Sequence, residues 1–196
     1  MGEEDVALEE YLDVCDEKGV PTGKTVKRSI AHAEGICHRT AHVWIVDRKG
    51  RRILLQKRSA QKDSYPGYYD TSSAGHVPAG DEPLSSALRE LQEELGITAL
   101  PEELFYIGSF HIAYETEFHG KPFKDSEVAK VFVLEKKVQM EDFVLQKEEI
   151  DEVKWFSLRE VMEEVQKPHP EREEKFCVPY QSLLLIQKYM QEEGEA

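Results

Sequence analysis

The chain has 196 residues, 40% of them hydrophobic, and a formal net charge of −14. This length can bury one sizeable core but hardly two, so we expect a single domain over residues 1–196. The sequence has no apolar run near the roughly 20 residues that span a bilayer and no basic-then-apolar leader, so we expect a cytoplasmic protein with no membrane partner. The cysteines, Cys15, Cys37 and Cys177, are widely spaced and odd in number, which argues against a disulfide framework or a zinc knuckle.

The charge is unevenly distributed along the chain. Residues 18–62 carry 12 basic residues against 2 acidic ones, a net charge of +10, and this cationic stretch suits a polyanionic substrate. Four of the cations flank an expected hairpin turn at Gly50 and are better explained by that turn. Lys27, Arg58 and Lys62 remain as candidate anion ligands. A long nucleic acid is a poor partner, because the overall charge repels it and no aromatic-basic interleaving is present.

Apolar periodicity and turn residues predict the secondary structure in chain order. After an acidic, ragged stretch at residues 1–9, we expect two hairpins separated by a short helical turn around His32, then a long loop and an amphipathic helix beginning near Pro83. Three strands and two helices follow, with a candidate flap between those helices. The expected ranges are 11–16 and 23–27 for the first hairpin, 42–46 and 53–56 for the second, 59–79 for the loop, 105–114, 130–135 and 152–156 for the strands, 158–165 and 180–192 for the helices, and 167–178 for the flap.

Strands interspersed with helices predict a mixed sheet with helices on both faces, which is an α/β sandwich. The last helix has an apolar face that we expect to cover the core. A homodimer formed through this helix stays open as an alternative.

Residues 75–97 carry the strongest chemical signal. Glu90, Glu93 and Glu94 are spaced i, i+3 and i+4, so they share one face of a helix, where their like charges repel one another. A bound cation relieves that repulsion. Apolar residues recur at helical spacing on another side, and Gly96 can take the left-handed conformation that ends a helix.

Adjacent glutamates recur throughout this acidic chain, so the pair alone carries little information. The fixed intervals carry more: residues 75–97 read G-x5-D-x7-R-E-L-x-E-E-x-G-I, which resembles the Nudix box, the signature of Nudix hydrolases. The family pattern has glutamate where this chain has Asp81. The resemblance implies a Nudix-type α/β/α sandwich, hydrolysis of a diphosphate linkage, and an Arg89 that holds a glutamate in place. Magnesium prefers oxygen ligands, so Glu90, Glu93, Glu94 and the Gly75 carbonyl are candidate ligands for Mg2+, or for Mn2+.

A finer resemblance, over residues 13–156, is to the branch of Nudix proteins that includes type I isopentenyl diphosphate isomerase. It is carried by separated segments in order, among them LLQKRS at 54–59, YPG at 65–67 and DSEV at 125–128. The resemblance implies that Lys27, Arg58 and Lys62 clasp a diphosphate. It also implies a second metal site, for zinc or manganese, whose ligands would be His32, His38, His76, Asp125 and Glu127.

The residue before Gly75 departs from the isomerase pattern. The isomerase needs an acid/base cysteine there, whereas this chain has Ala74, and a methyl group cannot exchange protons. The paired glutamates that the isomerase box tends to lose are intact here. Both differences favour hydrolysis over isomerisation. The candidate general bases are Glu90, Glu93, Glu127 and Glu149, of which we favour Glu127.

Substrate identity stays open at this point. Small nucleoside diphosphates, nucleotide sugars and isoprenyl diphosphates all present the same anion, and Tyr65, Tyr68 and Tyr69 can pack on either a base or a prenyl chain. Two further functions stay open as alternatives: an isopentenyl diphosphate isomerase-like enzyme and a non-catalytic diphosphate-binding module.

Overall fold

The computed structural model describes residues 9–168 and 174–191. All but the last residue of the expected ragged stretch, the middle of the expected flap and the final residue of the expected last helix lie outside the described residues. None of the helices within the described ranges is long and apolar enough to span a membrane.

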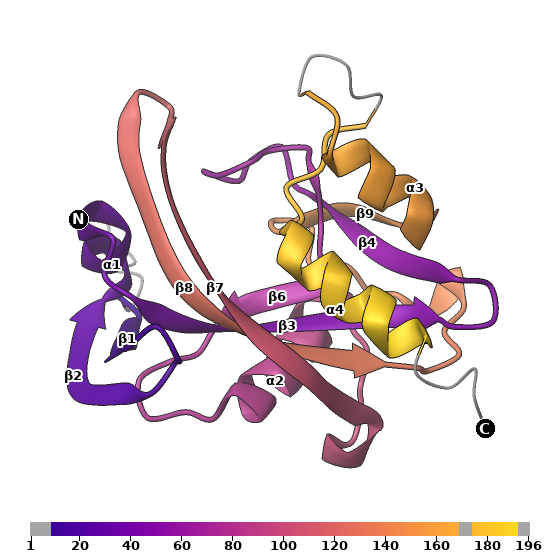
Figure 1. The fold of residues 1–196 in the computed structure, drawn as a ribbon, viewed down its shortest axis with the longest axis horizontal. Helices are drawn as coiled ribbons and strands as arrows, with labels where there is room; N and C mark the ends of the chain where they lie inside the picture. Colours follow the sequence, from indigo (N-terminus) through magenta and orange to yellow (C-terminus); the bar gives the residue numbers. More distant parts are fainter. Residues whose placement is uncertain (1–8, 169–173, 192–196) are drawn as a thin grey trace, which may run out of the picture.

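The described residues form strands and helices in an interspersed order (Figure 1). The strands are β1 (Tyr11–Cys15), β2 (Pro21–Lys27), β3 (His38–Asp47), β4 (Arg52–Arg58), β5 (Tyr69–Asp70), β6 (Ser73–His76), β7 (Leu104–Phe118), β8 (Lys121–Leu134) and β9 (Ile150–Ser157). The helices are α1 (Arg28–Glu34), α2 (Pro83–Leu95), α3 (Leu158–Val165) and α4 (Tyr180–Gln191), with 3-10 turns at Pro101–Glu103 and Met140–Asp142.

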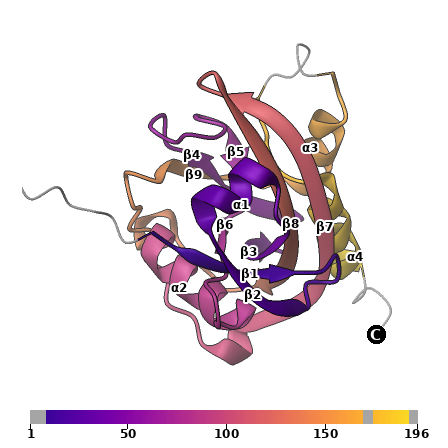
Figure 2. The same ribbon diagram turned by 90° about the vertical axis from the view of Figure 1, so that its left-hand side faces the viewer.

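β3 organises the main sheet. The strand order is β5-β4-β3-β8-β7, with β6 also paired to β3 and β9 paired to β4. β3 runs parallel to β8 and antiparallel to β4 and β6, so the sheet is mixed. β1 and β2 form a separate two-stranded sheet. Figure 2 shows α2 on one side of the strands and α3 and α4 on the other, which confirms the predicted α/β sandwich with a mixed sheet.

The two sides of β3 supply two hydrophobic cores, because successive side chains of a strand point to opposite faces. Trp44 and Val46 pack with residues of α3 and α4, while Val43 and Ile45 pack with residues of α2. The buried indole of Trp44 donates a 2.8 Å hydrogen bond from Nε1 to Ser182 Oγ of α4. The last helix therefore covers the core, as its apolar pattern predicted.

The largest difference from the predicted elements is the hairpin of β7 and β8, which reaches beyond both expected strands. Its two-residue turn, His119 and Gly120, has φ of 52° and 73°, as a tight hairpin turn with two left-handed residues requires. The hairpin projects from the body of the molecule in Figure 1. Residues 115–117 are Glu, Thr and Glu, and they are exposed, so they break the apolar alternation that marks a half-buried strand.

The expected loop at residues 59–79 is also partly wrong, because it contains β5 and β6. These strands are 2 and 4 residues long, and β6 reads Ser-Ala-Gly-His, which has no β-branched residue. Their hydrogen bonds come from longer neighbours, since β6 pairs with β3 and β5 pairs with β4. Tertiary pairing, rather than local preference, makes them strands.

Candidate functional site

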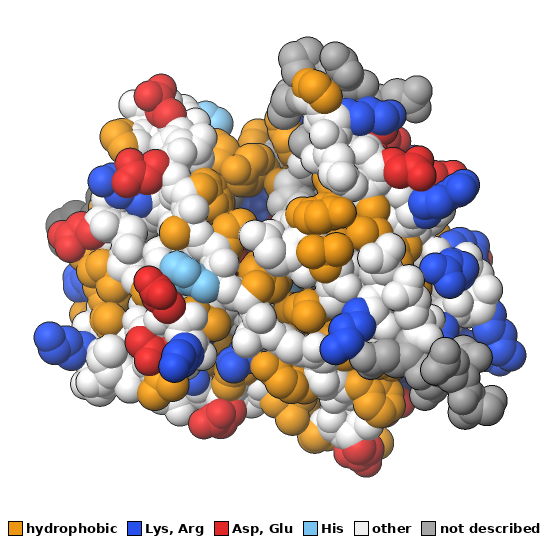
Figure 3. Space-filling model, viewed as in Figure 1, with side chains coloured by type: hydrophobic (Ala, Val, Ile, Leu, Met, Phe, Trp, Pro, Cys, Tyr) orange, Lys and Arg blue, Asp and Glu red, His pale blue; other side chains and the backbone are white. Residues whose placement is uncertain are grey.

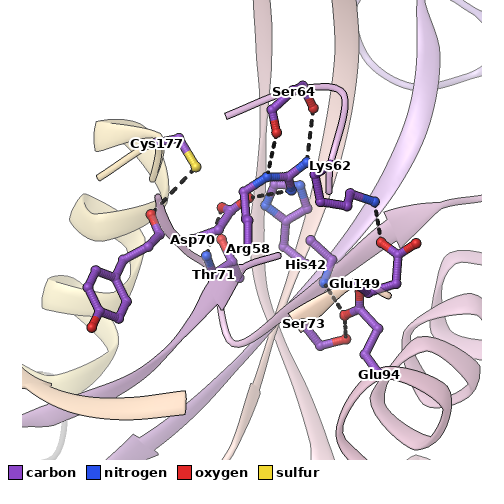
Figure 4. A network of polar contacts seen from close by, with 12 residues as sticks. His42, Arg58, Lys62, Ser64, Asp70, Thr71, Ser73, Glu94, Glu149 and Cys177 are labelled. Carbon is purple, nitrogen blue, oxygen red and sulfur yellow. Dashed lines mark hydrogen bonds and ion pairs between the residues drawn. The ribbon is translucent and has the colours of Figure 1, made fainter. Parts of the chain in front are cut away.

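Two of the three box glutamates point inward from α2 to β6. The carboxyl group of Glu90 lies against Gly75, where a Cβ atom would stand 2.3 Å from Glu90 Cδ, so only glycine leaves room for it. Glu94 is 7% exposed and accepts hydrogen bonds from Ser73 Oγ at 2.7 Å and from the Ala74 backbone N–H at 3.3 Å. Figure 4 shows Ser73 directed at the Glu94 carboxylate. Glu93 is exposed instead.

Arg89 links the acids along the helix. Its Nη2 lies 2.9 Å from Glu90 Oε1, and its Nη1 donates to Glu93 Oε2 at 3.2 Å. Arg89 thus contacts both Glu90 and Glu93. Its effect on turnover stays a prediction.

Burial raises the pKa values of the two acids that point inward, Glu94 and Glu90. It raises the pKa of Glu94 to about 8, opposed by the hydrogen bond from Ser73 and reinforced by the charge of Glu90. Burial also raises the pKa of Glu90, against the nearby positive charge of Arg89. Both carboxyl groups therefore favour protonation more than free glutamate does, and a divalent cation between them would favour the ionised forms. Glu90 and Glu94, with the Gly75 carbonyl, are the residues placed to hold such a cation.

Three histidines from separate elements meet on the other side of β6. His32 comes from α1, His38 begins β3 and His76 ends β6. Their ring centroids are 5.0 to 5.2 Å apart, and the Nε2 atoms of His32 and His76 are separated by 3.1 Å. Asp125 Oδ1 of β8 lies 3.5 Å from His32 Nδ1 and 3.9 Å from His38 Nε2. Register places Glu127 opposite His38 across the parallel pairing of β3 and β8.

These five residues form what we call the histidine-acid cluster: His32, His38, His76, Asp125 and Glu127. One potential ligand atom of each histidine lies within 4.8 Å of the other two, and the same holds for His38 with the two acids. The residues that the isomerase resemblance singled out thus come from four elements and fall into two groups that share His38: the three histidines, and His38 with Asp125 and Glu127.

The cluster contains polar atoms that fit a metal ion. His38 Nδ1 faces the Ile36 carbonyl oxygen at 2.9 Å, which assigns the proton to Nδ1 and leaves a lone pair on Nε2. That Nε2, His32 Nδ1 and Asp125 Oδ1 are buried and have no hydrogen-bond partner among the described residues. Burial, then the charge of Arg28, lowers the pKa of His76 well below its ordinary value, so its imidazole is neutral. Neutral imidazoles with carboxylates are the donor set of zinc and manganese.

The three candidate anion ligands have different surroundings. Arg58 is tied inside the protein: Nε and Nη2 donate to Ser64 O and Oγ at 2.9 Å each, and Nη1 lies 3.2 Å from Asp70 Oδ2 (Figure 4). Lys62 pairs with Glu149, as Figure 4 shows. Lys27 is exposed and pairs with Glu9 at 2.8 Å.

Sequence reasoning missed Arg28, whose charge reaches the histidine-acid cluster. Arg28 and Lys62 both lower the pKa of His76, so both lie close enough for their charge to act at the cluster. The available signal was the position of Arg28 next to Lys27 in the cationic stretch. The two residues differ in their surroundings because Lys27 ends β2 whereas Arg28 begins α1.

Glu127 is largely enclosed. Its side chain is 14% exposed and its Oε1 lies 3.6 Å from Nε2 of His42, a histidine outside the expected ligand set. β8 lies between β3 and β7, so Glu127 is on an interior strand. Glu127 is therefore neither at a sheet edge nor fully exposed to solvent.

A series of contacting aromatic rings begins at the cluster and extends to the hairpin. Phe123 stacks on His32 with centroids 4.8 Å apart, and Tyr65 meets Phe118 of the hairpin at 4.9 Å. Figure 3 shows hydrophobic side chains gathered in the hollow beside the projecting hairpin. Of the tyrosines considered for substrate packing, Tyr65 is consistent with that role, whereas Tyr69 is 3% exposed and belongs to the core beside α3 and α4. Sequence reasoning missed the two phenylalanines because it did not predict the hairpin.

The fold and the site together define a class of protein: a mixed α/β sandwich in which an acid-bearing helix packs on a glycine of the sheet. The family model of the NUDIX domain matches residues 37–177, so the chain belongs to the Nudix family. The expected hydrolase class is confirmed by two curated relatives. Nudix hydrolase 3 of Arabidopsis thaliana is 40% identical over 166 residues, which are 83% of this chain and 21% of that protein. An uncharacterized Nudix hydrolase of Clostridium acetobutylicum is 38% identical over 144 residues, 72% of this chain and 67% of that protein.

This chain therefore spans about a fifth of the length of the Arabidopsis relative. Among solved structures, DR0079 from Deinococcus radiodurans has a TM-score of 0.65 at 17% sequence identity, covering 92% of this chain and 99% of that one. At this identity the likeness shows the fold, and it confirms the predicted Nudix-type architecture.

Proposed function

We propose that the protein is a metal-dependent Nudix hydrolase that cleaves a diphosphate linkage in a small substrate. The observation that carries this proposal is the position of the buried Glu94 and the half-buried Glu90 against Ser73 and Gly75. Burying two acids at close quarters costs free energy that a divalent cation offsets. A purely structural helix would gain by replacing them with apolar residues.

Mg2+, or Mn2+, supplies positive charge at the diphosphate and activates water when it is bound. The chain's own residues do the rest. Glu90 and Glu94, with Glu93 and the Gly75 carbonyl, hold the ion, and Arg89 fixes the orientation of Glu90 and Glu93 through its two contacts. Lys62 neutralises the anionic substrate, which requires it to exchange Glu149 for the diphosphate. Lys27 and Arg58 complete the expected diphosphate clasp, Arg58 chiefly by holding the loop that bears Lys62.

Glu127 is our choice for the general base, the group that takes a proton from the attacking water. Its support is comparative: Glu90 is proposed to hold the ion, and Glu93 is exposed and paired with Arg89. Glu127 is enclosed beside His42 and lies where the histidine-acid cluster meets the interior of the sheet. Enclosure favours proton transfer because it excludes bulk water.

The histidine-acid cluster is proposed to hold a second ion, zinc or manganese. Its buried atoms without hydrogen-bond partners support this role, as does its set of imidazole and carboxylate donors. The same cluster supports placement in the isopentenyl diphosphate isomerase-like branch, as a hydrolase that has Ala74 in place of the isomerase cysteine. The aromatic rings beside it fit either a nucleoside base or an isoprenyl chain.

A substrate panel tests the proposal. Nucleoside and isoprenyl diphosphates are incubated with the protein in Mg2+ or Mn2+, and phosphate or monophosphate release is measured. Glu93→Gln and Glu94→Gln should abolish release, whereas Glu102→Gln, which alters another adjacent-glutamate pair on the surface, should leave it unchanged. Full activity in the box variants would contradict the mechanism.

The two alternative functions give different results in the same panel. An isomerase-like enzyme would exchange carbon-bound protons of an isoprenyl diphosphate with deuterium from solvent, without releasing phosphate. A non-catalytic diphosphate-binding module would bind a substrate with no turnover at any metal concentration. A homodimer and a cytoplasmic location remain predictions, to be checked by light scattering and by imaging of the tagged protein.

A further inference from the structure

Two of the three cysteines meet in space although they are far apart in sequence. Cys15 Sγ, at the end of β1, lies 3.5 Å from Cys37 Sγ, just before β3. The Cys15 N–H also donates a 3.0 Å hydrogen bond to the Cys37 carbonyl oxygen, so the two backbones are direct neighbours. Cys177 differs: its thiol contacts the Tyr69 carbonyl oxygen at 3.5 Å.

We propose that Cys15 and Cys37 are a redox modification site that closes reversibly to an intramolecular disulfide. The wide spacing in sequence argues against a framework of permanent disulfides, and the proposal agrees with that, because the pair is a dithiol in this structure. It does not depend on the diphosphatase activity proposed above.

The sulfur atoms need to approach by about 1.5 Å to reach the length of a disulfide bond. The surroundings of Cys15 permit this. β1 and β2 form a sheet of their own, β2 is exposed along nearly its whole length, and the register between the two strands already shifts between Asp13 and Cys15. A short strand pair with an irregular ladder moves more easily than a central strand.

The chemistry balances with glutathione disulfide as the oxidant. Cys37, the more exposed thiol, attacks one sulfur of glutathione disulfide, and the departing glutathione takes up the Cys37 proton. Cys15 then attacks the Cys37 sulfur of the mixed disulfide, and the second glutathione leaves with the Cys15 proton. Two protein thiols are oxidised and one glutathione disulfide is reduced to two thiols. Cys15 is 5% exposed, so the oxidant reaches Cys37 first and Cys15 acts second, from its place beside Cys37.

The crosslink would close a loop of chain that contains His32 of the histidine-acid cluster. The chain between the cysteines contains β2 and α1, and His32 lies on α1. Cys37 itself immediately precedes His38. Oxidation therefore ties both ends of this segment together beside the histidine-acid cluster.

Mass spectrometry of the full chain tests the proposal. The reduced protein is incubated with glutathione disulfide, denatured, and treated with N-ethylmaleimide, which labels every remaining thiol. We expect the wild type and Cys177→Ser to lose two hydrogens and to yield a peptide linking Cys15 to Cys37, with all thiols restored by dithiothreitol. Cys15→Ser should instead stop at a glutathione adduct on Cys37.

The wild-type protein alone decides the outcome, so a variant that fails to fold does not weaken the test. The proposal is overturned if every wild-type cysteine takes up N-ethylmaleimide after the oxidant treatment. It is equally overturned if glutathione stays attached to Cys37 of the wild type, or if the linked peptide contains Cys177.

Discussion

Replacing Glu94 with glutamine tests the electrostatics of the box helix most directly. The pKa of Glu94 is raised to about 8 from an ordinary 4.5, chiefly by burial, while the same group in the unfolded chain ionises near the ordinary value. Between these two pH values the folded state binds more protons than the unfolded state, so stability falls as pH rises. From pH 5 to pH 8 this carboxyl group alone lowers the free energy of unfolding by roughly 3 kcal/mol.

Glu94→Gln cannot ionise, so it removes that part of the pH dependence. Urea unfolding, followed by tryptophan fluorescence, would be measured for both proteins from pH 5 to pH 8 in the presence of a chelator. We expect the free energy of unfolding of the variant, relative to that of the wild type, to rise by roughly 3 kcal/mol from pH 5 to pH 8. Any effect of the amide that does not depend on pH leaves this change unaltered. Mg2+ at pH 8 should then stabilise the wild type and leave the variant unchanged. Parallel pH curves for the two proteins would refute the reasoning.

Three further predictions concern other parts of the molecule. Gly75→Ala places a Cβ where the Glu90 carboxyl group now lies, so kcat should fall by about 100-fold with little change in melting temperature; an unchanged kcat would show that Glu90 is dispensable. His38→Gln should weaken Co2+ binding at least about tenfold in an absorbance titration, and equal affinity would remove His38 from the ligand set. Ser182→Ala leaves the Trp44 indole without its acceptor and should cost about 1 to 3 kcal/mol in urea unfolding; no loss would mean that water replaces the hydroxyl.

The box helix was well predicted because its signals are local. Apolar periodicity, a proline near its start and a glycine after its end predict a helix from near Pro83 to Gly96, and the structure has α2 at Pro83–Leu95 with Gly96 at φ 71°. Which of the glutamates is buried and which is exposed was not predictable in the same way. Glu94 is buried and Glu93 is exposed because β6 lies against one part of the face that they share. That partner is set by tertiary packing.

The remaining misses also depend on contacts between distant parts of the chain. β6 is a strand only because β3 pairs with it, and Cys15 meets Cys37 only because β1 lies beside the segment before β3. The long hairpin escaped detection because its far end is exposed on both faces, and alternation of apolar residues arises only where one face is buried. The histidine-acid cluster was found through a family resemblance, because spacing alone relates none of its members.

Gly75 and His76 are consecutive residues of a four-residue strand, and they face opposite ways: one makes room for Glu90, and the other stacks with His38. Inserting a single residue ahead of them in β6 would exchange their directions. The imidazole of His76 would then face Glu90 on α2, and the histidine-acid cluster would lack one of its histidines. A single insertion would therefore disrupt both groups of candidate metal ligands. The two groups of residues are thus coupled through the side-chain alternation of one short strand.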